Sequence, residues 1–234
     1  MSIIRFMLGK RSLEKGKKEL KESVAAFKKE ISRLDNASDS IIQASTAENI
    51  LIIKTQSYSI GTMAKVTLGN YSTVDLNNKC QYKITTKDGT EAFVSNTEET
   101  LFTTRDILTI YDTRTGKRKI GTIKQWLVSG GVPLFEKDAK TCTVTLQNEK
   151  LCDLKKCVFF GDLQIETSAS FLKVRIESDN EYSIHYKGQK IAKLHEIPAK
   201  LKDGFVDRYV LEYNDKKHTH IVVMLAIALD IVNN

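Results

Sequence analysis

The sequence predicts a mainly β (α+β) fold, a closed antiparallel barrel of ten or more strands around a buried hydrophobic C-terminal helix. Residues 221–232, IVVMLAIALDIV, are apolar on every side of any helix they form, apart from Asp230. A helix of this kind must be hidden on all faces. From Ile50 onward, apolar and polar residues alternate with the period of strands, in units that read strand, turn, strand. Strands that close into a barrel surround such a helix completely.

Residues 11–42 are the first predicted element, an amphipathic helix. Its apolar residues follow heptad spacing, with intervals of 4, 3, 4, 3 and 7 residues. They are Leu20, Val24, Phe27, Ile31, Leu34 and Ile41. Three arrangements fit this pattern. In the first, the helix packs on its own domain. In the second, it pairs with a protein partner or a second copy of the chain, and in the third it lies on a membrane surface. We therefore expect an N-terminal helical extension at 1–48, with a linker at 43–49, and a barrel domain at 49–234.

Four hairpin-like copies follow, at residues 82–94, 108–123, 142–154 and 182–194. Their turns are expected at Asp88-Gly89, Thr115-Gly116, Asn148-Glu149 and Lys187-Gly188, where Gly permits the positive φ of tight hairpins. Further strand-like pieces lie between the copies. They are Lys65–Leu68, Thr100–Thr104, Val158–Phe160, Leu163–Glu166 and Phe171–Ser178.

A fifth copy begins at Tyr209 but does not return as a strand. After Asn214-Asp215 the chain enters a block, 217–233, that is rich in Ala, Leu, Met and Ile and lacks Gly and Pro. This block is longer than a typical strand, so we predict a helix. Its apolar run is too short to cross a bilayer, which requires about 20 apolar residues. The helix is therefore expected at the centre of the domain.

Composition limits the functional classes. The chain has 36 Lys/Arg and 29 Asp/Glu, and residues 10–29 alone hold eight bases and three acids. A mild basic excess permits contact with anionic membranes or nucleic acid, although a solvated surface also explains it. The four cysteines form no C-x-x-C pair, and there is no apparent signal peptide, which together predict a cytoplasmic protein with reduced thiols.

The main candidate for ligand binding is a basic hairpin, DTRTGKRK. It contains Arg114, Lys117, Arg118 and Lys119 beside flexible Gly116, and such a turn can hold a phosphate head group. The alternative is a solvated, exposed turn without a ligand.

Three other features of the sequence are candidate sites. Asp230 lies near the end of the apolar helix, where an unpaired buried charge is very costly, so we expect a structural helix-end acid with a polar partner. His218 and His220 are two residues apart, which is the wrong spacing for two metal ligands on one helical face, so no metal site is predicted. Trp126 is expected to cover an end of the barrel, or else to contact a membrane or partner.

The order of elements resembles the end of the LURP-one-related proteins. The resemblance covers about residues 80–234 and includes the late hairpin, IAKLHE at 191–196, DRYVLEYND at 207–215 and the final apolar run. These proteins belong to the tubby C-terminal-like superfamily, together with the phospholipid scramblases. The resemblance implies a barrel of about twelve strands around a hydrophobic C-terminal helix. It also makes lipid head groups plausible ligands, without transferring binding residues. Before its helix, this chain has no evident acidic calcium loop of the kind associated with scramblases.

These observations favour a non-enzymatic intracellular module that binds anionic lipid head groups or another anionic ligand at a membrane surface. One alternative is a structural or regulatory protein that acts through partners of residues 11–42. Another is an enzyme of unrecognised type, although the common nucleotide-binding, metalloprotease and hydrolase motifs are missing. No cofactor is expected, and nucleic acid is the less favoured anionic partner.

Overall fold

The computed structural model of the chain describes residues 2–55, 82–98, 107–126, 141–159, 162–200 and 207–233. The strand-like pieces predicted at Lys65–Leu68 and Thr100–Thr104 lie outside these ranges. Trp126 ends a described strand, but its side chain is not described.

One long helix, twelve strands and one C-terminal helix make up the described structure. The helix α1 spans Ser2–Ala44. The strands are β1 (Asn49–Thr55), β2 (Tyr82–Thr86), β3 (Glu91–Glu98), β4 (Ile107–Asp112), β5 (Arg118–Trp126), β6 (Thr141–Leu146), β7 (Glu149–Phe159), β8 (Asp162–Thr167), β9 (Leu172–Ser178), β10 (Glu181–Tyr186), β11 (Gln189–Ile197) and β12 (Arg208–Tyr213). A short 3₁₀ turn, η1 (Lys216–His218), leads into α3 (Thr219–Asn233).

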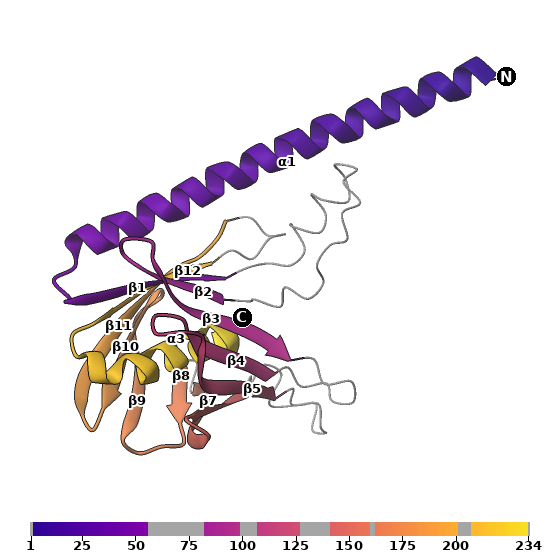
Figure 1. Cartoon of the computed structure of the whole chain (residues 1–234). Coiled ribbons are helices and arrows are strands. Elements are labelled where there is room, and N and C mark those ends of the chain that lie inside the picture. Colours follow the sequence, from indigo (N-terminus) through magenta and orange to yellow (C-terminus); the bar gives the residue numbers. More distant parts are fainter. Residues whose placement is uncertain are drawn as a thin grey trace.

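All twelve strands form one antiparallel sheet that curls into a nearly closed barrel (Figure 1). Except for β8 and β9, neighbouring strands in the chain pair with each other, and β1 pairs with β12 to join the first strand to the last. The two ends of the sheet are β8 and β9, which follow each other in the chain. The predicted antiparallel barrel and its C-terminal helix are therefore confirmed.

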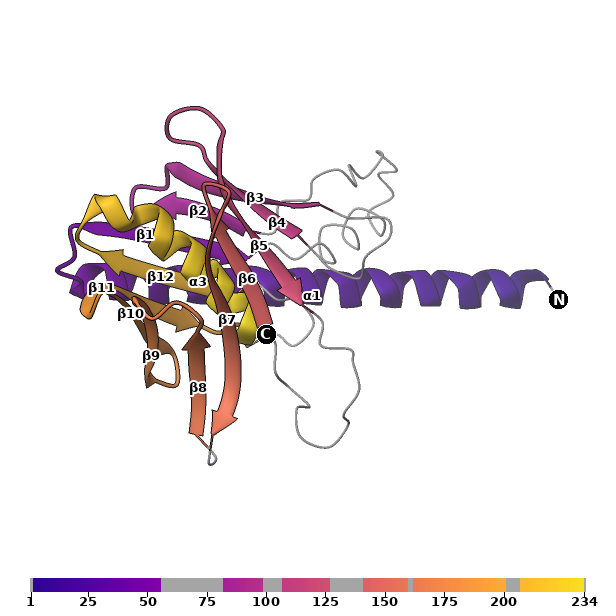
Figure 2. The ribbon, with the colours of Figure 1, turned by 90° about the horizontal axis from the view of Figure 1, so that it is seen from below.

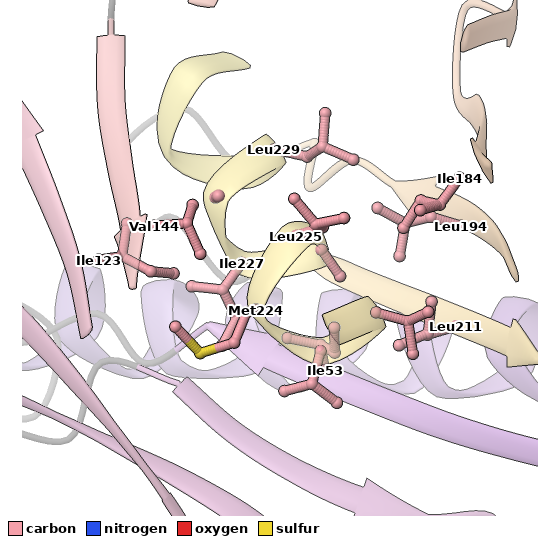
Figure 3. Packing of buried hydrophobic residues seen from close by; sticks show 14 of the residues in the cluster. Ile53, Ile123, Val144, Ile184, Leu194, Leu211, Met224, Leu225, Ile227 and Leu229 are labelled. Atoms are coloured by element: carbon pink, nitrogen blue, oxygen red, sulfur yellow. The ribbon is translucent and has the colours of Figure 1, made fainter. Parts of the chain in front are cut away.

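The helix α3 runs through the inside of the barrel (Figure 2). Eleven of its fifteen residues are buried, from Thr219 to Val232. Its side chains meet different strands on different sides. Ile227 points toward Ile123 and Val144 (Figure 3). Leu225 points toward Leu194 on another side (Figure 3). The all-round apolarity of the sequence is thus explained by a sleeve of strands.

Close packing around α3 requires glycine at position 121 of β5. A Cβ atom added to Gly121 would lie 2.1 Å from the backbone oxygen of Thr145 and 2.9 Å from Cε of Met224. Both distances are far below van der Waals contact, and one of the atoms belongs to backbone that cannot move aside easily. Gly121 therefore lets β5 approach both β6 and the helix.

The strand β1 is buried on both of its faces. Leu51 and Ile53 join the barrel core, while Ile50 belongs to a second apolar cluster outside the barrel. In that cluster, Leu34 of α1 is fully buried, together with Val210 of β12. The C-terminal part of α1 thus packs on the outer face of the barrel.

Polar contacts hold the same part of α1. Asp35 pairs with the buried Arg208 guanidinium. Glu30 accepts hydrogen bonds from Arg33, at 2.7 Å, and from the backbone N–H of Lys200, also at 2.7 Å. Hydrogen bonds from Arg33, then from Lys200, lower the pKa of Glu30 to about 2. The part of α1 before Glu30 extends away from the barrel (Figures 1 and 2).

Two predicted details are corrected. The turn between β6 and β7 uses Gln147 and Asn148, both with positive φ, and Glu149 already belongs to β7. The piece predicted as a separate strand from Val158 is the end of β7. The full length of β7 was missed for two reasons. The turn before it was predicted one residue too late, and polar residues in the middle of the strand interrupt its apolar pattern.

Candidate functional site

The short connections of the barrel gather at one end. Because consecutive strands are antiparallel, every connection that follows an even-numbered strand lies at the same end, where β1 begins and α3 begins. We call this the turn end and define it by these turns and the exposed residues that border them. Its segments are residues 45–48, 87–90, 113–119, 147–150, 168–171, 187–190 and 214–217.

Most of the net charge of the protein lies at the turn end. Its 31 residues include ten Lys/Arg and four Asp/Glu, all of them exposed, for a net charge of +6. The rest of the chain has 26 Lys/Arg and 25 Asp/Glu, for a net charge of +1. The ten bases are Lys87, Arg114, Lys117, Arg118, Lys119, Lys150, Lys187, Lys190, Lys216 and Lys217. The charge excess of the barrel is therefore localised on one end.

The predicted basic hairpin is part of this end, between β4 and β5. Lys117, Arg118 and Lys119 are exposed, and Nζ of Lys117 lies 5.0 Å from the centroid of the Tyr111 ring. Arg114 differs from the other three. Its guanidinium forms two hydrogen bonds to Asp112, at 3.0 and 2.6 Å, and lies 4.6 Å from the centre of the Phe93 ring. Three of the four predicted bases thus have no carboxylate partner among the described residues.

Asp112 connects the hairpin to the start of α3. Its buried carboxylate lies 3.2 Å from Nε2 of His220, in addition to its bonds to Arg114. Burial by itself would raise the pKa of Asp112, but the hydrogen bonds from Arg114 and His220 outweigh it and lower the pKa to about 2. Asp112 therefore fixes the hairpin relative to the core helix.

Six cations of the turn end were not part of the predicted site: Lys87, Lys150, Lys187, Lys190, Lys216 and Lys217. Each stands in a separate turn or pair, so no single window of the sequence is strongly basic. A signal was nevertheless present, since the predicted hairpins place every second connection at the same end of a barrel. Summing charge over those turns would have found the cluster.

Asp230 lies at the opposite end of α3, and it is buried. Its carboxylate accepts hydrogen bonds from the hydroxyls of Tyr82 in β2 and Tyr209 in β12. Burial, then the nearby negative charge of Asp230, raises the pKa of both tyrosines well above the ordinary value, so they stay protonated donors. This arrangement ties the last turn of α3 to two strands.

A second set of polar contacts closes the same end of α3. The amide Nδ2 of Asn233 donates to the Tyr182 hydroxyl at 2.8 Å, and that hydroxyl donates to Glu196 at 3.2 Å. Nζ of Lys156 donates to the backbone oxygen of Asn233 at 3.3 Å. Lys156 and Glu196 are half-buried, whereas the charged groups of the turn end are exposed to solvent.

The remaining candidate side chains are the histidines and cysteines. Across the described ranges, His, Cys, Asp and Glu form no group of three or more that could hold a metal ion. Cys142 and Cys152 are free and buried in the core, and burial raises the pKa of each thiol to about 12. Thiols of this kind are unreactive at neutral pH.

The extending part of α1 is exposed where its side chains are described. Residues 21–26 are exposed, Val24 to 38%. None of the described helices is both long enough and apolar enough to span a membrane.

Comparisons with known proteins return one structural likeness. No family model matches the chain, and no curated protein matches it. The chain is similar to the X-ray structure of the Arabidopsis thaliana protein AT5G01750, a LURP-one-related protein, with a TM-score of 0.41 and 14% identity. The alignment covers 80% of this chain and 94% of that one. The fold described above stands on the strand pairing of this chain alone.

Proposed function

We propose that this protein is a non-enzymatic module that binds anionic lipid head groups at the cytoplasmic surface of a membrane, through the turn end of its barrel. The observation that carries the proposal is the charge distribution. A set of 31 residues holds +6 of the net charge, on turns that face solvent.

The cations of the turn end are available to an external anion. Only three of the ten pair with a carboxylate among the described residues: Arg114, Lys150 and Lys217. The other seven remain uncompensated there. A Lys or Arg near an anionic membrane contributes about 1 kcal/mol of binding free energy. Several of them acting together are therefore enough for reversible, salt-sensitive attachment.

The arrangement favours a surface over a strand of nucleic acid. The bases come from five separate turns around one end of the barrel, so they present charge over an area. A single-stranded nucleic acid is instead bound along a groove that follows its backbone and is lined with stacking aromatic rings. Lipid head groups in a bilayer match the distributed pattern.

Co-sedimentation with vesicles tests the proposal. The wild-type chain is expected to pellet at low salt with vesicles of phosphatidylcholine and phosphatidylserine, and not with phosphatidylcholine alone. The variant Lys117→Gln, Arg118→Gln, Lys119→Gln removes three charges from the turn end. We expect it to bind about 100-fold more weakly, since each charge contributes about 1 kcal/mol.

A matched control removes the same charge elsewhere. The variant Lys21→Gln, Lys28→Gln, Lys29→Gln changes three exposed lysines of α1 and should bind these vesicles like the wild type. Equal losses in the two variants would contradict the proposal. So would a failure of the wild type to bind anionic vesicles at low salt, or tighter binding to an oligonucleotide than to vesicles.

A second candidate function is association with a protein partner through α1. Val24 is exposed on the part of the helix that extends beyond its contacts with the barrel. An isolated helix is marginally stable in water, so an extension of this length benefits from a partner. Light scattering of the wild type and of Val24→Glu tests self-association. An identical monomer mass for both would remove a second copy of the chain as the partner.

We also infer that the chain belongs with the LURP-one-related proteins of the tubby C-terminal-like superfamily. The inference is supported by the order of elements around residues 191–233 in the sequence and by the barrel around α3. A family model built from an alignment of close homologues tests it, because it should match known members over the whole barrel.

A further inference from the structure

The turn end also carries an exposed aromatic ring. Phe171, in the turn between β8 and β9, is 41% exposed. Among the described residues, it and Val24 of α1 are the large hydrophobic side chains that are exposed. Single exposed apolar residues are common on protein surfaces and need no function. The position of Phe171, its rigidity and its neighbours make it a more specific feature.

The Phe171 ring is held in place by two turns. Its neighbour Leu172 is buried, so the chain on one side of it is fixed in the core. Its backbone oxygen accepts a hydrogen bond of 2.7 Å from the N–H of Lys187 in the turn between β10 and β11. A ring on a backbone fixed in this way loses little entropy when it enters another phase.

A second aromatic ring supports the first. Phe171 meets Tyr186 edge to face, with ring centres 5.7 Å apart and an interplanar angle of 78°. Tyr186 in turn contacts the ring of His218 in η1, with centres 5.3 Å apart. Because Tyr186 also packs against the barrel core, the ring of Phe171 rests on a supported base.

Cations surround this aromatic pair. Nζ of Lys187 lies 5.4 Å from the centre of the Tyr186 ring. Lys190 lies in the same turn as Lys187, and Lys216 and Lys217 precede His218. Aromatic rings prefer the interface between hydrocarbon and water, while Lys and Arg prefer the head groups directly above it. An exposed ring within a set of cations matches both layers of an anionic membrane.

We propose that Phe171, supported by Tyr186, is an aromatic anchor that inserts into the interfacial layer of the membrane bound by the turn end. This inference rests on the proposed function and adds a second, apolar component to it. Cations attract the barrel to the anionic surface, and the ring then contributes an interaction that salt does not screen.

Two variants of Phe171 test the anchor on anionic vesicles. Phe171→Ala should bind about tenfold more weakly than the wild type. As salt is added, the variant should lose its remaining binding at a lower salt concentration than the wild type does. Phe171→Trp should retain binding. Vesicle lipids with brominated acyl chains should quench its fluorescence beyond the quenching of the wild type, whose single tryptophan is the baseline.

The other exposed apolar side chain supplies the matched control. Val24→Ala and Val24→Trp lie on α1, and they should show unchanged binding and no added quenching. The anchor is overturned if Phe171→Ala binds as tightly as the wild type, or if vesicle-bound Phe171→Trp is quenched no more than Val24→Trp. If the triple-Gln hairpin variant still loses its affinity in that case, the electrostatic function stands without the anchor. Absence of vesicle binding by the wild type overturns both.

Discussion

The protein has two cationic regions, and they lie at opposite ends of the barrel. The turn end carries a net charge of +6, and residues 10–29 of α1 hold eight bases and three acids, while all remaining residues together are net negative. At the end opposite the turns, Glu30 contacts the backbone of Lys200, which follows β11. The preceding part of α1 therefore extends away from that end of the barrel.

This difference shows that charge alone does not define a binding surface. One flat membrane cannot contact the turn end while also contacting a helix that extends from the other end. The two regions also differ in support. The bases of the turn end stand on short turns of a packed barrel, beside an exposed ring, whereas those of α1 belong to a helix whose packing on the barrel begins only near Glu30. This difference is why we propose the turn end, and not α1, as the lipid-binding surface, with a protein partner as the proposal for α1.

The largest expected loss of stability comes from disrupting the core of the barrel, which separates the two regions. Ala226 of α3 is buried among apolar side chains. Ala226→Asp places an unpaired charge there and should cost at least several kcal/mol of unfolding free energy, which is enough to prevent folding. Circular dichroism during urea unfolding measures this. Ala25→Asp, on the exposed surface of α1, should fold nearly as well as the wild type. A cooperatively folded Ala226→Asp variant would refute the central position of α3.

A smaller loss of stability is expected from removing hydrogen bonds only at the end of the barrel opposite the turns. Tyr82→Phe and Tyr209→Phe each remove a hydrogen-bond donor from the buried Asp230 carboxylate. Each should lower the unfolding free energy by about 1–3 kcal/mol, while vesicle binding stays unchanged because the turn end is intact. Tyr111→Phe is the control at a half-buried site. Loss of vesicle binding in a folded Tyr209→Phe variant would show that the two ends are not independent.

The smallest expected change in stability concerns Asp112, the acid that fixes the basic hairpin. The pKa of Asp112 in the folded protein is about 2, below its ordinary value of 3.8. A lowered pKa contributes stability above the ordinary value, and this contribution is lost as the pH falls toward 2. Asp112→Asn should therefore be less stable than the wild type at neutral pH. The difference in unfolding free energy between the two should narrow between about pH 4 and pH 2.

Urea unfolding at several pH values measures this difference, with Asp39→Asn on the exposed surface of α1 as the control. A difference that stays constant down to pH 2 would contradict the role of the Asp112 carboxylate. Because the variant also releases Arg114 from its partner, its affinity for anionic vesicles should be equal to that of the wild type or slightly higher.

Sequence reasoning predicted those parts of the fold that depend on local pattern. The period of two identified the hairpins, and the apolar run of residues 221–232 predicted a helix inside them. The alternation predicted from Ile50 onward fails in the strand β1, whose residues Ile50 to Ile53 are all apolar, so this strand was not singled out. Only the packing of Leu34 from α1 explains why its outer face is apolar as well.

The sequence by itself therefore determined the kinds of elements and the central place of α3, since hydrophobic period is a property of neighbouring residues. It also identified the basic hairpin, because four bases lie within six residues, from Arg114 to Lys119. Only the tertiary structure decided which bases share a surface. It paired both Arg114 and His220 with Asp112, brought Lys187 and Lys217 to the same end as the hairpin, and directed α1 away from that end. The physical reason is that antiparallel closure brings together turns that are far apart in the chain.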